Sequence, residues 1–329
     1  MRLCAVIVVI MLSMVLAPLG GQAQSTGSLA RVGLLVGNLA TGVHLIEAFR
    51  EGLRHLGYVE GRSLVIEVRD ARGALDRLPA LAAELAALKV DVLVTTGRDG
   101  ALAGKQAALT VPVVAVVVGD PVGLGLVTSL ARPGGNMTGF SNMAPDLVAK
   151  CLEQLKHVVP HARRVAVLRQ RGELSERPAN DMLRNAEAAG RTLGVQLQVV
   201  DVRGPEEFTR AFADMSRGRA EALLVLGGPM FFRARERLVE MVAQQRLPAV
   251  YQEREFVQAG GLMAYGADYV DIFRGAATYV DKILKGAKPG ELPVVQPTKF
   301  ELVINARTAR ALGLTIPPSL LARAHHIID

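Results

Sequence analysis

Short polar segments follow several apolar runs of this 329-residue sequence, and their residue types suit the binding of a small charged molecule. Thr96-Gly97-Arg98-Asp99 follows one run, Asp120-Pro121 a second, and Glu253 a third. The carboxylates of Asp120 and Glu253 suit a ligand ammonium, whereas Arg98 and Arg171 suit a ligand carboxylate. Simpler interpretations stay open, because Asp120-Pro121 is also typical of a strand end or helix cap and both arginines of solvated loops.

No combination of residues typical of an active site accompanies these segments. A GxGxxG sequence does not follow the first apolar run, and neither a phosphate-binding P-loop nor a nucleophile elbow is present. His157 and His161 flank Pro160, which disrupts the helical spacing of a metal site, and His325-His326 is a tail dipeptide. We therefore predict that the protein is not an enzyme and holds no metal and no cofactor.

A net charge of +7, from 38 basic and 31 acidic residues, raises the question of a nucleic-acid partner. The basic residues are scattered along the chain: Arg210, Arg217 and Arg219, for example, are interleaved with Phe212 and Met215. This pattern is typical of solvated helix faces, so we expect no nucleic-acid partner.

Residues 1–23 have the order of a secretory signal. Arg2 precedes an apolar run over 3–16, which is shorter than the ~20 residues of a membrane span, and small residues favour cleavage near Ala23. We expect a periplasmic protein with no stable membrane insertion after cleavage. The alternative is an uncleaved anchor.

Apolar runs alternate with amphipathic stretches in both halves of the chain, which predicts parallel strands alternating with helices. The first half has expected strands at 31–37, 64–68, 90–95 and 112–118 and helices at 43–56, 75–88 and 99–109. The second half has expected strands at 164–168, 195–202, 222–226 and 248–251 and helices at 179–193, 205–216 and 232–245. Two copies predict two doubly wound parallel-sheet α/β lobes, with 132–142 as the first crossing between them.

Ligands of open α/β sheets bind beyond the carboxyl ends of the strands, and two facing lobes place both sets of ends in one cleft. This rule selects Gly37, Asn38, Thr96, Gly97, Arg98, Asp99, Asp120, Pro121, Gln170, Arg171, Gly228, Pro229, Met230, Gln252 and Glu253, with Ser141 and Asn142 at the crossing. Aromatic residues that suit either ligand stacking or core packing are Phe231, Phe232, Tyr251, Phe256 and Tyr265.

Three long stretches resemble the ABC-transporter substrate-binding proteins of the tryptophan/tyrosine-binding type. They cover 49–85, 111–141 and 251–324 and include GDPVGLGLVTSLARPGGNMTG and FELVINARTARALGLTIPPSLL. The resemblance implies a type I periplasmic-binding fold, a three-crossing hinge that closes on a small solute, and a permease with its ATPase as partners. The family's pattern places ligand contacts at Thr96, Gly97, Asp120, Pro121, Ser141, Gly228, Pro229, Met230, Glu253 and Phe256.

Two loops depart from the family's pattern, Arg98-Asp99 and 169–173, where small polar and Asn/Pro-rich turns are common. Both loops are expected at the cleft. The expected ligand is therefore an amino acid or related carboxylate, a wider class than the aromatic amino acid that the resemblance implies.

We therefore expect a monomeric periplasmic solute-binding component of an ABC importer, or, as the alternative, an exported sensor that presents its solute to a membrane receptor. The expected organisation is a signal peptide at 1–23, an N-terminal lobe at 29–140 plus about 266–296, a C-terminal lobe at 141–265, and a tail at 297–329 whose lobe stays open. We expect ligand contacts at Asn38, Thr96, Gly97, Arg98, Asp120, Pro121, Ser141, Gln170, Gly228, Pro229, Met230, Tyr251, Glu253, Phe256 and Tyr265.

Overall fold

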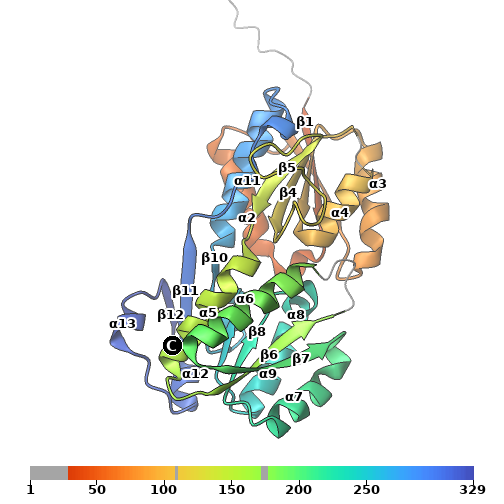
Figure 1. The fold of residues 1–329 in the computed structure, drawn as a ribbon. Helices are drawn as coiled ribbons and strands as arrows, with labels where there is room; N and C mark the ends of the chain where they lie inside the picture. The colour runs from red at the N-terminus through yellow and green to blue at the C-terminus, as the bar shows by residue number, and fades with distance from the viewer. Residues whose placement is uncertain (1–28, 108–109, 172–176) are drawn as a thin grey trace, which may run out of the picture.

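A computed structural model of the protein describes residues 29–107, 110–171 and 177–329. The predicted signal peptide and its cleavage position near Ala23 lie outside these residues, as do residues 172 and 173 of the departing loop at 169–173. The described chain forms two lobes, one above the other in Figure 1. No helix of the described residues has both the length and the apolar character needed to cross a membrane.

The first lobe contains a parallel sheet in the order β2-β1-β3-β4-β5. Its strands are β1 (Ala30–Val36), β2 (Leu64–Asp70), β3 (Val92–Thr96), β4 (Val113–Val118) and β5 (Met137–Ser141). Its helices are α2 (Val43–His55), α3 (Leu78–Ala87) and α4 (Gly97–Ala107), with single 3-10 turns at Leu39–Thr41 and Leu75–Arg77.

The second lobe contains a sheet in the order β12-β11-β10-β9-β8-β6-β7. Its strands are β6 (Arg164–Gln170), β7 (Gln196–Val202), β8 (Ala222–Val225), β9 (Ala249–Tyr251), β10 (Met263–Ala267), β11 (Phe300–Asn305) and β12 (His326–Ile328). Its helices are α5 (Ala144–Val158), α6 (Arg177–Leu193), α7 (Phe208–Arg217), α8 (Pro229–Arg233), α9 (Arg235–Gln244), α10 (Arg254–Gln258), α12 (Ala306–Ala311) and α13 (Pro318–Leu321), with a 3-10 turn at Pro205–Glu207. Only the β10–β11 pair is antiparallel among the described strands.

The chain passes between the lobes three times. It leaves the first lobe between β5 and α5, and it returns between β10 and α11 (Tyr269–Leu284), a helix that packs against α2. It then runs along the first lobe through a 3-10 turn at Pro289–Glu291 and leaves again between Val295, which is bridged to Phe140, and β11. The predicted fold class is confirmed: two α/β lobes of mostly parallel strands are joined by several chain crossings.

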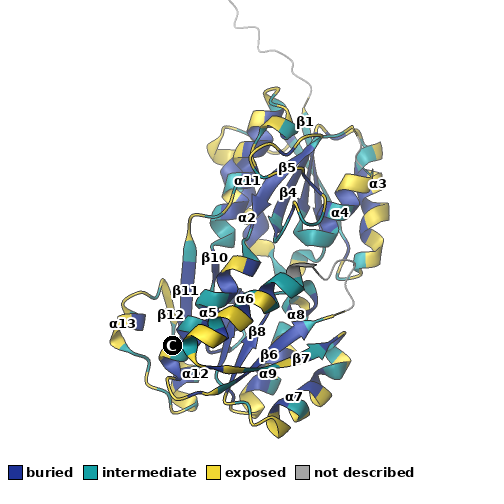
Figure 2. Cartoon of the chain, in the orientation of Figure 1, coloured by how far each residue is buried: buried dark blue, intermediate teal, exposed yellow. Residues whose placement is uncertain are grey.

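Apolar strands buried on both faces form the centre of each lobe, as the dark blue of Figure 2 shows. In the first lobe, β4 has the sequence VVAVVV, and such continuous runs are typical of parallel strands covered by helices on both sides. Helices α2 and α11 cover one face of this sheet, while α3 and α4 cover the other. In the second lobe, α5 and α6 cover one face and α7 and α9 the other.

Each of the first two crossing strands contains a glycine where a neighbouring backbone comes very close. Gly139 in β5 has a φ of 148°, and a Cβ atom there would overlap the carbonyl oxygen of Ala115 in β4. A Cβ atom on Gly266 in β10 would overlap the carbonyl oxygen of Gln252 in the same way. Any side chain at these positions therefore pushes a crossing strand away from its sheet.

We expect Gly139→Ala to lower the free energy of unfolding by about 2 kcal/mol or more, because the methyl group forces β5 away from β4. Thermal and urea unfolding measure this loss. Gly100→Ala in α4 is the control, since its Cβ atom would have ordinary contacts with nothing nearer than 3.7 Å, and a helical alanine is favourable. Equal stability of the two variants would contradict the close approach at Gly139.

Candidate ligand-binding site

A cavity of about 280 Å³ lies between the lobes, at the carboxyl ends of strands from both sheets. The loops after β1, β3 and β4 contribute its wall in the first lobe, and the end of β6 and the loops after β8 and β9 contribute its wall in the second. Asn142 from the first crossing and Tyr269 from the second complete it. The Nδ2 atom of Asn142 donates a hydrogen bond to the Tyr269 hydroxyl at 3.1 Å, so the cavity floor also ties two crossings together.

Most of the cavity wall is apolar. The apolar and aromatic side chains are Leu39, Leu45, Ile46, Leu75, Leu78, Val117, Leu124, Met182, Leu226, Phe232, Tyr269 and Phe273. Such a wall favours a ligand with a sizeable apolar part, while a few polar groups fix its orientation.

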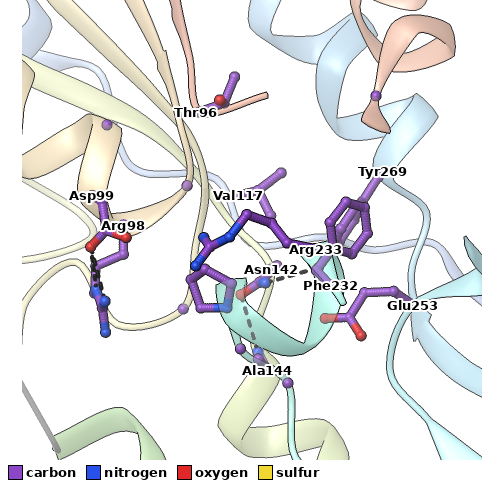
Figure 3. Close-up of a pocket in the computed structure, with 18 of the residues that line it drawn as sticks. Thr96, Arg98, Asp99, Val117, Asn142, Ala144, Phe232, Arg233, Glu253 and Tyr269 are labelled. Carbon is purple, nitrogen blue, oxygen red and sulfur yellow. Dashed lines mark hydrogen bonds and ion pairs between the residues drawn. The ribbon is translucent and has the colours of Figure 1, made fainter. Parts of the chain in front are cut away.

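Val117 occupies a strained position on this wall. Its φ is 62°, which is unusual for a β-branched residue, and the pairing of β4 with β5 shifts register between Val116 and Val118. Figure 3 shows the Val117 side chain at the cavity. The irregularity thus redirects one side chain of a buried strand toward the space between the lobes.

Arg233, the last residue of α8, is the cation that enters the cavity without an ion-pair partner among the described residues. Figure 3 shows it extending from α8 toward the side where Arg98 and Asp99 pair at 2.9 Å. Arg233 is exposed to the open cleft, yet the protein atoms around its guanidinium displace enough water to lower its pKa. Asp99 opposes this shift and Arg98 adds to it. A guanidinium remains charged at neutral pH, so Arg233 is available to an anion.

Glu253 lies at the other side of the view in Figure 3, beside Tyr269. It precedes α10 and has no ion-pair partner within the described part of the chain. Burial, followed by the negative charge of Glu255, raises the pKa of Glu253 to about 8. The carboxyl group is therefore largely protonated at neutral pH, and a nearby cation would favour its ionised form.

The remaining charged side chains at the cavity are engaged by the protein. Arg169 contacts both carboxylate oxygens of Asp201, at 2.7 and 2.8 Å, and Arg171 reaches the same carboxylate at 3.4 Å. Burial alone would raise the pKa of Asp201, but the hydrogen bonds and charges of the two arginines hold it below its ordinary value. The Oδ1 atom of Asp120 accepts a hydrogen bond from the backbone of Gly123 at 2.7 Å, so Asp120 also stabilises a turn.

The cavity brings together much of the residue set expected from sequence. Lining residues from that set are Asn38, Thr96, Gly97, Arg98, Asp120, Gln170, Gly228, Pro229 and Glu253. Pro121 and Ser141 instead line an adjoining hollow that shares Asp120 with the cavity. The Oγ atom of Ser141 accepts a hydrogen bond from the backbone of Met143 at 3.1 Å, at the first crossing.

The structure places four residues of the expected set behind the cavity wall. Tyr251 and Phe256 stack on each other in the second lobe's core, with ring centroids 4.6 Å apart, and Met230 is buried beside them in the same cluster. Tyr265 packs against Phe300, with centroids 6.4 Å apart. The strand-end rule identifies the loops but does not say which face of the sheet a particular ring will enter.

Sequence reasoning did not select Arg233, Val117 or Tyr269 for the site. Tyr269 directly follows the β10 crossing, and Arg233 lies one helical turn after the Gly228-Pro229 loop. A helix that begins at a strand-end loop turns its first residues toward the same cleft. This rule would have selected Tyr269 and Arg233 from the sequence. Within the described ranges, no group of three or more His, Cys, Asp or Glu side chains is arranged to hold a metal ion.

Comparison with known proteins identifies this arrangement. The model of the family described as "ABC transporter substrate binding protein" matches residues 42–328. The tyrosine-binding protein of Clostridioides difficile (strain R20291) is 24% identical over 270 residues, which are 82% of this chain and 76% of that protein.

Two solved structures are similar over nearly their whole length. A conserved domain protein from Vibrio cholerae O1 biovar El Tor has a TM-score of 0.83 and 28% identity, covering 91% of this chain and 99% of its own. An ABC domain from Streptococcus pneumoniae, solved in complex with L-Trp, has a TM-score of 0.79 and 25% identity, covering 90% and 100%. The matching family is one of substrate-binding proteins rather than of enzymes.

The raised pKa of Glu253 predicts how stability depends on pH. Between about pH 4.5 and 8, the folded state keeps a proton that the unfolded state has lost, so the free energy of unfolding falls as the pH rises through this range. We expect Glu253→Gln, which does not titrate, to be more stable than the natural protein above pH 8, by on the order of 5 kcal/mol, with little difference near pH 4.5.

Urea unfolding across this range measures the difference. Glu236→Gln, at an exposed position of α9, is the control and should leave the pH profile of the natural protein unchanged. Parallel profiles for Glu253→Gln and the natural protein would contradict a protonated Glu253.

Proposed function

We propose that this chain, which belongs to the family of ABC transporter substrate-binding proteins, captures an amino acid or related carboxylate between its lobes and delivers it to the permease of an ABC importer. The observation that carries the proposal is the cavity between the two sets of strand ends, whose mostly apolar wall carries one cation and one carboxyl group without ion-pair partners among the described residues.

The charges of the cavity favour a ligand of matching polarity. Arg233 is suited to a carboxylate, for which a guanidinium offers two parallel donors. Glu253 is suited to an ammonium, whose positive charge would favour loss of the carboxyl proton. The apolar wall between them suits an apolar or aromatic side chain, and the tyrosine-binding relative and the L-Trp complex support this ligand class.

The proposed contacts combine the residues expected from sequence with those that the cavity adds. They are Asn38, Thr96, Gly97, Arg98, Asp120, Gln170, Gly228, Pro229, Arg233, Glu253 and Tyr269. Pro121 and Ser141 act from the adjoining hollow, and Met230, Tyr251, Phe256 and Tyr265 support the loops from the core.

Capture occurs by rotation of the lobes about the crossings. One moving body consists of residues 29–140 and about 266–296, and the other of 141–265 together with 297–329, which contribute β11 and β12 to the second sheet. Residues 1–23 direct export and are removed near Ala23, so that the protein acts as a periplasmic monomer. Closure buries the solute and creates the surface that the permease recognises.

A thermal-shift screen of residues 24–329 tests capture. The panel contains amino acids, their deaminated counterparts such as 3-phenylpropionate beside L-phenylalanine, small carboxylates and neutral sugars. A ligand at 100 times its Kd adds about 2.7 kcal/mol, which is an easily visible shift. We expect stabilisation by amino acids or carboxylates with an apolar part; stabilisation by sugars alone would overturn the ligand class.

We expect Arg233→Ala to weaken binding of the ligand found in that screen by roughly 10- to 100-fold, because a charge-assisted hydrogen-bonded pair is lost. Isothermal titration calorimetry measures the change. Arg171→Ala is the matched control: its guanidinium pairs with Asp201, which Arg169 continues to hold, and it does not line the cavity. Equal losses in both variants would show that Arg233 does not anchor the ligand.

A further inference from the structure

The loop that follows β8 is held between two glutamine side chains. In the second sheet, β8 lies between β6 and β9. Gln170 is the last residue of β6, and Gln252 directly follows β9. The Oε1 atom of Gln170 accepts a hydrogen bond from the backbone N–H of Met230 at 3.3 Å, and that of Gln252 accepts one from Gly227 at 3.1 Å. The loop that leads into α8, and so to Arg233, is therefore fixed to both neighbouring strands.

Two glycines allow this close approach. A Cβ atom on Gly228 would lie 2.8 Å from Oε1 of Gln170, and a Cβ atom on Gly227 would lie 2.4 Å from Oε1 of Gln252. A side chain at either position would displace the glutamine oxygen from its hydrogen bond. Glycine at both positions thus permits both hydrogen bonds.

These hydrogen bonds fix the orientation of each carboxamide. Only the oxygen of a carboxamide accepts a backbone N–H, so its NH2 group must face the other way. The Nε2 atom of Gln252, a residue that is 5% exposed, donates to the carbonyl oxygen of Ala144 at 2.6 Å, so both ends of this amide are engaged. The Nε2 atom of Gln170 has no hydrogen-bond partner among the described residues, and Gln170 lines the cavity. Gln170 therefore has a donor to offer to a solute.

Gln170 and Arg233 share one end of the cavity wall. Both also line a side hollow of about 360 Å³ beside the main cavity, whereas Glu253 lines only the main cavity of these two spaces. Gln170, α8 and Arg233 all belong to the second lobe, so their arrangement does not depend on the angle between the lobes. An amide NH2 group and a guanidinium are both hydrogen-bond donors, and the two oxygens of a carboxylate can accept from both.

We propose that Gln170 is a specificity-determining residue that selects a solute carboxylate together with Arg233, because α8 fixes its amide with the donor toward the cavity. The inference deepens the proposed capture of an amino acid or related carboxylate and rests on it. It gives the solute a direction: the carboxylate lies against the end of β6 and α8, and the ammonium lies toward Glu253. An ammonium in the place of the carboxylate would meet two donors and no acceptor.

Calorimetric titration at one fixed pH tests this selection. The probes are L-phenylalanine, L-tryptophan and L-leucine, each beside its carboxamide, which lacks the negative charge. In Gln170→Glu, which is nearly isosteric, one oxygen can still accept the Met230 N–H, while the other replaces the NH2 group with a negatively charged acceptor. We expect the preference for acid over amide, measured as the ratio of their Kd values, to fall roughly 100-fold, because the carboxylate would face a like charge.

Two further variants separate selection from a general effect of charge or folding. Gln170→Met has a similar length and neither donates nor accepts a strong hydrogen bond, so it should lower the same preference by roughly three- to tenfold and carries the test if Gln170→Glu does not fold. Gln244→Glu is the matched control, because it adds the same charge at an exposed position of α9 outside the cavity wall, and it should keep the natural preference. Thermal unfolding without probes reports whether each variant is folded.

An acid-to-amide preference that stays unchanged in the Gln170 variants would overturn the role of Gln170. This holds even if these variants bind every probe more weakly, since a purely structural defect affects acid and amide alike. The natural protein would then still bind the acids, and the proposed function would stand. Binding of none of the three acids by the natural protein would instead overturn the capture of apolar amino acids on which the inference rests.

Discussion

The position of each lobe is constrained by the three passages of the chain between them. β5 is the edge strand of the first sheet and β10 an inner strand of the second, yet both end at the boundary between the lobes, and Asn142 and Tyr269 join their continuations. Gly139 and Gly266 allow these strands to approach their neighbours more closely than any side chain permits. Because these strands are held so tightly to the sheets, the proposed rotation of the lobes would be restricted to the few residues that follow each strand.

Two chemical demands meet at this cavity. Apolar side chains exclude water from the wall of the cavity. Exclusion of water raises the free-energy cost of any charge that has no partner. The protein satisfies most of its own charges locally, as the Arg98–Asp99 and Arg169–Asp201 pairs do, but leaves Arg233 and Glu253 without ion-pair partners in the described chain. The shifted pKa of Glu253 expresses the cost of this arrangement. A solute with both a carboxylate and an ammonium group would reduce this cost by pairing with Arg233 and with Glu253.

The fold was predictable from sequence because buried parallel strands have an unmistakable signature. Runs such as VVAVVV, separated by amphipathic stretches, indicated the strands and loops, and the rule about their carboxyl ends located the cavity. Side-chain direction was not predictable. The Tyr251 and Phe256 rings entered the core, and a register shift turned Val117 toward the cavity. Contacts between distant segments, such as His44 with Glu255, also depend on lobe orientation, which no local pattern encodes.

The order of segments along the chain also governs when each lobe can form. The first lobe's core needs α11, which follows almost the whole second lobe in sequence, and the second sheet is finished only when β12 at the extreme C-terminus pairs with β11. Contacts so distant in sequence make folding slow. The chain loses the entropy of closing long loops before the contacts can stabilise it. The first lobe therefore cannot be completed before α11 is available, nor the second sheet before β12 is. For the proposed export of this chain, such a delay would keep the polypeptide unfolded until it has crossed the membrane.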